Sequence, residues 1–164
     1  EARGLSNLMH PADERPQTLR FGAAPMFDLT GSANELRSAV SNLTNNAVRY
    51  TPGGGLIEVQ WQRLPDGGAR LVVTDSGPGI APQHLPRLGE RFYRVDRSRS
   101  RESGGTGLGL AITKHVAQRH GGELQIRSEL GHGSTFALEF PPQRVRAAST
   151  AAFVPGSVAH NAEA

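Results

Sequence analysis

Two asparagines and an arginine fall on one face of a predicted helix. Asn42, Asn46 and Arg49 are spaced four and three residues apart, so their side chains share that face. Amide oxygens can bind magnesium, and a guanidinium offers a fork of donors to phosphate oxygens. The spacing therefore suggests a site for a magnesium–phosphate group. The alternative for this helix alone is that the asparagines are simply solvated.

A carboxylate ends a predicted strand further along the chain. The sequence there is Asp75-Ser-Gly-Pro-Gly-Ile80. A carboxylate accepts hydrogen bonds from a ligand, and the two glycines would let the backbone approach a flat ligand closely. A plain Asp-Ser-Gly turn remains the alternative for this motif in isolation.

A glycine-rich run opens a second predicted helix, which covers residues 111–120. The run is Gly104-Gly-Thr-Gly-Leu-Gly-Leu110. Amides at the start of a helix point outward, and the helix dipole favours phosphate there. The run is not a dinucleotide fingerprint, because no strand immediately precedes it, and it lacks the lysine ending of a Walker loop. The arginine-rich segment 94–103 before it is expected to be a lid or disordered.

The asparagine-bearing helix is predicted over residues 32–52. Ser32 and Glu35 have the spacing of a capping box, and Pro52 with the glycines after it ends the helix. Its apolar stripe consists of Leu36, Val40, Leu43, Ala47 and Tyr50. This stripe would pack on a core and leave the polar face available to a ligand.

Alternating patterns and turn residues predict the remaining elements. A hairpin is expected at 57–74, with its turn at Pro65-Asp-Gly-Gly68. Edge strands are expected at 18–21 and 26–29, a short helix at 85–93, a glycine stop at 121–122, and strands at 124–128 and 136–140. The second helix has the apolar residues Leu110, Ile112, Val116 and Ala117. Beyond Pro142 we expect a disordered tail.

The composition restricts the possible functions. The chain has 164 residues, enough for one domain, and it contains no cysteine, so disulfides and zinc fingers are excluded. No run is apolar enough to cross a membrane, and no signal peptide is visible. The chain opens on Glu1, which suggests a fragment of a longer protein. All six histidines are expected on the surface, and the arginine cluster has no nucleic-acid-binding pattern beside it.

Together these motifs resemble the catalytic and ATP-binding domain of sensor histidine kinases, in the GHKL superfamily. The resemblance rests on Asn42-Leu-Thr-Asn-Asn-Ala-Val-Arg-Tyr50-Thr-Pro, Asp75 to Ile80, Glu90-Arg-Phe-Tyr-Arg94, Gly105-Thr-Gly-Leu-Gly-Leu110 and the weaker Gly133-Ser-Thr-Phe136. It implies a two-layer α/β sandwich (the Bergerat ATP-binding fold), with a mixed, mostly antiparallel sheet and helices on one face. The implied domain covers residues 18–142, between a linker or helix end at 1–17 and a disordered tail at 143–164.

The resemblance also implies the roles of individual residues toward Mg-ATP. Asn46 would bind Mg2+ with Asn42 near it, Arg49 and Arg94 would contact phosphates, and Asp75 would accept the adenine amino group. The four residues expected to carry the chemistry are Asn42, Asn46, Arg49 and Arg94. The remaining nucleotide-binding residues would be Tyr50, Gly77, Gly79, Ile80, Gly105, Thr106, Gly107, Leu108, Gly109, Leu110 and Thr135.

The implied activity is transfer of the γ-phosphoryl of ATP to a histidine on a separate dimerisation domain, and from there to a response-regulator aspartate. The family's phosphoacceptor motif is absent from this chain, so it would not phosphorylate itself. Related ATPases carry a glutamate where this chain has Asn42, which cannot act as a base, so hydrolysis should be slow. The parent is expected to be an inner-membrane sensor with this domain in the cytoplasm. A nucleotide-binding module without kinase activity and a GHKL-type ATPase are the alternatives.

Overall fold

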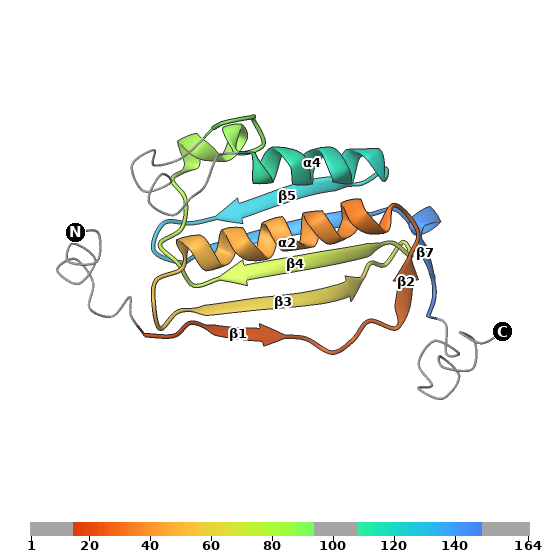
Figure 1. Cartoon of the computed structure of the whole chain (residues 1–164), viewed down its shortest axis with the longest axis horizontal. Coiled ribbons are helices and arrows are strands. Elements are labelled where there is room, and N and C mark those ends of the chain that lie inside the picture. Colours follow the sequence, from red (N-terminus) through yellow and green to blue (C-terminus); the bar gives the residue numbers. More distant parts are fainter. Residues whose placement is uncertain (1–14, 94–107, 149–164) are drawn as a thin grey trace.

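Five strands form the main sheet of the computed structural model, which describes residues 15–93 and 108–148. In spatial order they are β1 (Thr18–Phe21), β3 (Leu56–Arg63), β4 (Ala69–Asp75), β6 (Ser134–Phe140) and β5 (Glu123–Ser128). β1 runs parallel to β3, and the other neighbouring strands are antiparallel (Figure 1). The predicted hairpin joins β3 to β4, where Asp66 Oδ1 accepts a hydrogen bond from the Gly68 amide at 2.8 Å.

Two helices lie over one face of this sheet: α2 (Ala33–Tyr50) and α4 (Gly109–Arg119). The core between the layers contains Ala39, Leu43 and Ala47 of α2, Val116 and Ala117 of α4, and Ile57, Leu71, Val73, Phe136 and Leu138 of the sheet. The predicted two-layer α/β sandwich with a mostly antiparallel sheet is therefore confirmed. Of the apolar residues named for the second helix, Ile112 is 46% exposed, whereas its neighbour Thr113 is fully buried.

The start of α2 is capped by two different elements. Ser32 Oγ accepts a hydrogen bond from the Glu35 amide at 3.3 Å, as the predicted capping box requires. In a complete capping box the Glu35 side chain would also accept a hydrogen bond from the Ser32 amide. Here the Ser32 amide donates instead to His120 Nε2 at 3.1 Å, and the Glu35 carboxylate pairs with Arg119 at 3.1 Å. The N-terminus of α2 is thus attached to the C-terminus of α4.

His120 is buried, so the prediction that all histidines are surface residues is wrong for this one. Its side chain is only 4% exposed and its ring meets Phe140 edge-on at 6.3 Å. Its Nδ1 bonds the Val116 carbonyl at 2.8 Å. Because the Ser32 amide can only donate, Nε2 accepts and the proton lies on Nδ1. The predicted glycine stop follows, since Gly121 has φ +78° and the Gly122 amide donates to the Ala117 carbonyl at 2.8 Å.

The segment predicted as a short helix at 85–93 has a different structure. A 3₁₀ helix, η2 (Pro82–Arg87), comes first, and turns continue to Tyr93. Pro82 and Pro86 have no backbone N–H to donate, so an α-helical ladder cannot run through them. Tyr93 nevertheless packs back on this segment, where its hydroxyl bonds His84 and its ring lies 4.3 Å from the guanidinium carbon of Arg87.

A second, two-stranded sheet contains part of the predicted tail. β2 (Phe27–Leu29) pairs antiparallel with β7 (Val145–Ala147), which follows the 3₁₀ turn η3 (Pro142–Arg144). The disordered tail predicted from residue 143 is therefore wrong for its first residues. Sequence periodicity missed β7 because the strand has only three residues and its partner lies more than a hundred residues earlier. Residues 149–164, and residues 1–14 of the predicted linker, lie outside the described ranges.

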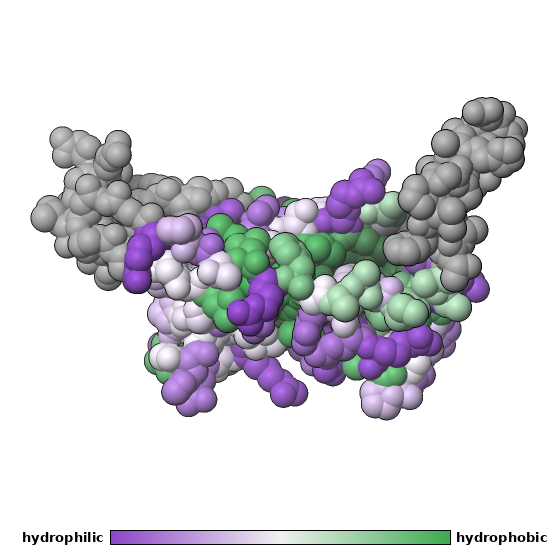
Figure 2. Space-filling model, turned by 90° about the horizontal axis from the view of Figure 1, so that it is seen from below, coloured by the Kyte–Doolittle hydropathy of each residue, from purple (hydrophilic) through white to green (hydrophobic). Residues whose placement is uncertain are grey.

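The β1 edge of the main sheet carries exposed apolar side chains. Leu19 is 42% exposed and Phe21 is 65% exposed. Figure 2, viewed toward this edge, shows hydrophobic side chains gathered along the middle of the face. The predicted edge position of β1 is confirmed.

Candidate functional site

Asn42 connects the middle of α2 to the first turn of α4. Its Nδ2 donates to the Gly109 carbonyl at 3.3 Å, and the Thr113 hydroxyl donates to the same carbonyl at 2.9 Å. The start of α4, where helix amides have no intrahelical partner, therefore lies beside the polar face of α2. Asn46 is half-buried one turn further along that face. An anion at the start of α4 would thus lie close to the asparagine face of α2.

Asp75 is the last residue of β4 and is almost completely buried, with 8% of its surface exposed. Its Oδ1 accepts the Gly77 amide at 2.9 Å, and the Ser134 amide also bonds this carboxylate. Burial raises the pKa of Asp75 above its ordinary value of 3.8, and the two backbone hydrogen bonds partly oppose that rise. An ionised carboxylate has more acceptor sites than these two amides use, so Asp75 can also accept a hydrogen bond from a ligand.

The end of α2 packs against the loop that follows Asp75. A side chain at Gly77 would lie 3.0 Å from the Tyr50 carbonyl and 2.9 Å from Asp75 Oδ1. Thr51 borders the same glycine, is 4% exposed, and has the one buried side-chain polar atom without a hydrogen-bond partner among the described residues. Asp75 and Thr51 therefore both border Gly77, and each has a polar side-chain atom with spare hydrogen-bonding capacity.

The next part of the loop packs against the β5–β6 hairpin. Gly79 has φ +80°, and a side chain there would lie 2.3 Å from the Glu129 carbonyl. The Ile80 amide donates to Ser128 Oγ at 2.7 Å, and the Gly131 amide donates to the Pro78 carbonyl at 2.8 Å. The sequence predicted Gly79 to be a glycine so that the backbone could approach a ligand. In the structure a glycine is needed because a side chain would collide with the Glu129 backbone.

Ser134, and not the predicted Thr135, lies beside Asp75. Ser134 is paired with Asp75 across β4 and β6, is 7% exposed, and its Oγ lies 2.9 Å from Ser128 Oγ. Thr135 pairs with Thr74 and, by the alternation of a strand, projects from the other face of the sheet. The signal was available in the sequence, because Phe136, Leu138 and Phe140 define the core face and Ser134 continues their period of two.

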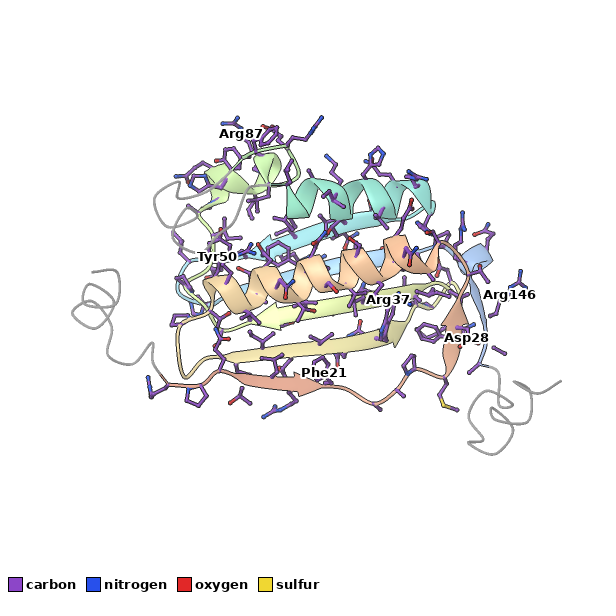
Figure 3. All side chains as sticks on the ribbon, viewed as in Figure 1. Phe21, Asp28, Arg37, Tyr50, Arg87 and Arg146 are labelled. Atoms are coloured by element: carbon purple, nitrogen blue, oxygen red, sulfur yellow. The ribbon has the colours of Figure 1, made fainter. Side chains whose placement is uncertain are left out.

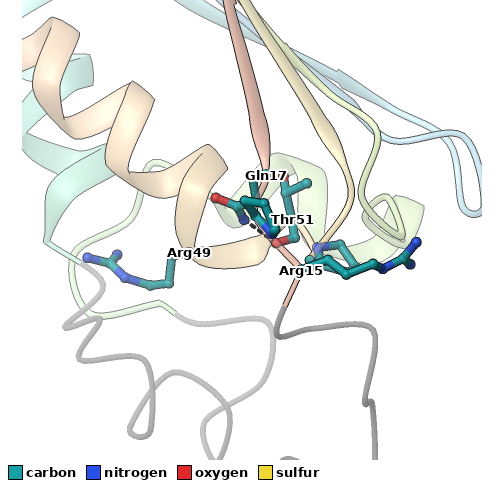
Figure 4. Close-up of a pocket in the computed structure, with 7 residues that line it drawn as sticks. Arg15, Gln17, Arg49 and Thr51 are labelled. Atoms are coloured by element: carbon teal, nitrogen blue, oxygen red, sulfur yellow. Dashed lines mark hydrogen bonds between the residues drawn. The ribbon is translucent and has the colours of Figure 1, made fainter.

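Arg49 is exposed at the C-terminal end of α2. With Arg15, Gln17, Thr51 and neighbouring residues it lines a polar hollow of about 400 Å³ (Figure 4). Gln17 holds this region together, since its side-chain amide donates to the Val48 carbonyl at 2.8 Å and to the Thr51 carbonyl. In Figure 4 the guanidinium groups of Arg49 and Arg15 point away from each other. The hollow lies at the C-terminal end of α2, and Thr51, which helps to line it, also borders Gly77 of the loop after Asp75.

The other predicted site residues are only partly described. Tyr50 is half-buried at the last turn of α2 (Figure 3), and Leu108, Gly109 and Leu110 form the start of α4. Arg94, Gly105, Thr106 and Gly107 lie outside the described residues. The structure thus brings three elements to one place: α2, the loop after Asp75, and the start of α4. From Asn42 to Tyr50 the helix rises about 12 Å, so a ligand in contact with both ends must be elongated.

Comparison with known proteins agrees with this geometry. A family model described as histidine kinase-, DNA gyrase B-, and HSP90-like ATPase matches residues 31–144, which is most of the chain. The solved mycobacterial sensor histidine kinase MprB aligns with a TM-score of 0.66 at 30% identity, covering 90% of this chain and 93% of that one. The chain belongs to this ATPase family, as the catalytic domain of a sensor histidine kinase.

Curated relatives of this catalytic domain are much longer than the chain. The phosphate regulon sensor protein PhoR of Pseudomonas aeruginosa is 54% identical over 131 residues, which is 80% of this chain and 29% of PhoR. The sensor-like histidine kinase SenX3 of Mycolicibacterium smegmatis is 42% identical over 79% of this chain and 34% of that protein. The catalytic domain thus spans about a third of their length. Among the described residues, no helix has the length and hydrophobicity to cross a membrane.

Proposed function

We propose that this domain binds Mg-ATP along the polar face of α2. The adenine would lie at Asp75 and Thr51, and the phosphates at the start of α4. The observation that carries the proposal is the convergence on α2 of a buried carboxylate with spare acceptor capacity and a helix N-terminus. The family is described as an ATPase family. A solved structure of full-length ShkA is a complex with AMPPNP. It aligns at 30% identity with a TM-score of 0.68, over 90% of this chain and 30% of that one.

Each proposed residue has a separate task. Asp75 accepts the adenine amino group, and the start of α4 receives phosphate oxygens. Asn46 supplies an amide oxygen to magnesium, which would neutralise charge on the phosphates. Among the described parts of the chain, no group of three or more His, Cys, Asp or Glu side chains could hold a metal. Magnesium takes oxygen ligands, and an asparagine amide oxygen could supply one while the nucleotide's phosphates would supply others, so the residues present fit the ion.

Asn42 favours phosphoryl transfer over hydrolysis. A glutamate at this position could remove a proton from water, whereas Asn42 is an amide and its Nδ2 is already bonded to Gly109. ATP would then persist until a histidine nitrogen attacks the γ-phosphorus and the bond to the β–γ bridging oxygen breaks, with ADP as the leaving group. Arg49 and Arg94 are proposed to stabilise the charge that develops on the phosphates.

The function of the parent protein follows from that reaction. We propose that the acceptor is a histidine on a separate dimerisation domain and that a response-regulator aspartate receives the phosphoryl group next. The parent would be an inner-membrane sensor that carries this domain in the cytoplasm. Its relatives' names, which include the phosphate regulon sensor protein, support a sensor role.

Two measurements on the 164-residue chain test the proposal. Calorimetry with AMPPNP and magnesium should show binding, and incubation with ATP should phosphorylate a supplied phosphoacceptor domain on histidine. Binding without transfer would indicate a nucleotide-binding module, and rapid phosphate release without an acceptor would indicate an ATPase. Absence of any nucleotide binding would contradict the proposal as a whole.

A further inference from the structure

The exposed apolar side chains of β1 lie on the same side of the sheet as the helices. Leu19 pairs with Ile57 and Phe21 pairs with Val59, and both partners are buried core residues. Side chains opposite each other in neighbouring strands share a face, so Leu19 and Phe21 extend the core face beyond the cover of α2. Met26, a few residues later, is 84% exposed. We call Leu19, Phe21 and Met26 the β1 strip.

The backbone of β1 also has an open edge. Among the described strands β1 pairs only with β3. The amides of Thr18 and Gly22 donate to the Gly55 and Val59 carbonyls, so by alternation the amides of Leu19 and Phe21 point away from β3. Proteins usually protect such an edge with charge, proline or a covering segment. The one charged residue of β1, Arg20, pairs with Glu58 at 3.2 Å on the other face of the sheet.

The C-terminal segment leaves the described structure beside this strip. Ala147 is the β-ladder partner of Phe27, the residue that follows Met26. The chain then continues without a charged side chain until His160, and it includes the apolar pair Phe153-Val154.

The length of this segment fits the distance it would have to cover. Phe21 and Phe27 are six residues apart, so their Cα atoms are at most about 21 Å apart. Adding about 5 Å between Ala147 and Phe27 gives about 26 Å, which about eight extended residues span. Because about 26 Å is an upper limit, residues 148–155 are long enough to reach Phe21 while running antiparallel to β1, and Phe153-Val154 lie in the last part of that span.

We propose that residues 150–157 bind the β1 edge as an added antiparallel strand, with Phe153 or Val154 packed on the β1 strip. This replaces the disordered tail that the sequence predicted. The segment would pair with the outward amides of Leu19 and Phe21 and remove apolar surface from water. The strip lies on the side of α2 away from Asn42, so nucleotide binding does not depend on this contact.

Amide exchange followed by NMR tests the contact in the full 164-residue chain and in a chain that ends at Ala148. The amides of Leu19 and Phe21 should exchange at least about tenfold faster in the shorter chain. The amides of Val59 and Leu71, inside the sheet, should be unchanged, and so should the affinity for AMPPNP with magnesium.

Point variants separate a specific contact from a general effect of chain length. The double variant Phe153→Asp with Val154→Asp should speed exchange at Leu19 and Phe21 as truncation does, while Asn161→Asp, which lies beyond the reach of β1, should not. Equal exchange in the full and shortened chains would overturn the proposal. Protection that depends on protein concentration would indicate a second copy of the chain at this edge. Protection lost on removal of residues 1–14 alone would indicate that the N-terminal segment covers it. Either result would also overturn the proposal.

Discussion

Replacing Asp75 with asparagine should weaken nucleotide binding and strengthen the fold. The variant keeps the shape of the side chain, and its one oxygen has two lone pairs to accept the amides of Gly77 and Ser134 that now bond the carboxylate. The second carboxylate oxygen becomes an NH2 group, which cannot accept a hydrogen bond from an adenine amino group. Loss of one charge-assisted hydrogen bond costs about 1.5–3 kcal/mol, or about ten- to a hundredfold in affinity.

The effect on stability has the opposite sign. Because burial raises the folded-state pKa of Asp75 above 3.8, the folded protein binds this proton more tightly than the unfolded chain does. Ionisation therefore costs stability: that cost is absent below pH 3.8, grows as the pH rises through the folded pKa, and is complete above it. Asparagine removes the cost, so Asp75→Asn should raise the free energy of unfolding at neutral pH. The same raised pKa means that nucleotide affinity should fall on acidification at a higher pH than for an ordinary aspartate.

Calorimetry with AMPPNP and magnesium, together with urea unfolding, measures both effects. Asp66→Asn is a matched control, because Asp66 Oδ1 also accepts the amide two residues later, at 2.8 Å, but its side chain is exposed in the hairpin turn. The control should change neither affinity nor stability by more than about 0.5 kcal/mol. Unchanged affinity in Asp75→Asn would refute the adenine role, and a less stable Asp75→Asn would refute the argument from burial.

The remaining predictions concern the metal, the hairpin and the helix junction. Asn46→Ala should abolish the magnesium dependence of nucleotide binding measured by calorimetry with and without EDTA, and a persisting dependence would place the metal elsewhere. Ser134→Ala should weaken AMPPNP binding more than Thr135→Ala, because only Ser134 lies beside Asp75, and the reverse order would contradict the register. His120→Ala should lower the free energy of unfolding in urea by about 2–4 kcal/mol, since it leaves the Ser32 amide unpaired and opens a cavity. The exposed His115→Ala on the same helix should cost less than about 0.5 kcal/mol, and equal costs would show that the His120 contact is unimportant.

Local patterns in the sequence were sufficient to predict much of this fold. The periodicity of α2 and the alternation of β3 each depend on neighbours a few residues away, and the hairpin turn supplies its own hydrogen bond through Asp66. The position of Asp75 at the end of β4 followed from the same alternation. These features need no knowledge of distant contacts, and the structure has them as predicted.

The failed predictions depend on contacts between distant residues. His120 is buried because the start of α2 offers its ring a backbone amide 88 residues away. The short strand β7 exists only because β2 is beside it. The register between β4 and β6 likewise brings Ser134 to Asp75, while the nucleotide contact of Thr135 stays a prediction. In each case the deciding partner is invisible to a pattern read along a short window.

The most direct test of the account is a crystal structure of the domain with AMPPNP and magnesium. In that crystal structure the adenine amino group should donate to the Asp75 carboxylate, the phosphates should lie at the start of α4, and Asn46 should contact the metal. A nucleotide bound instead in the hollow between Arg15 and Arg49, with Asp75 untouched, would contradict it.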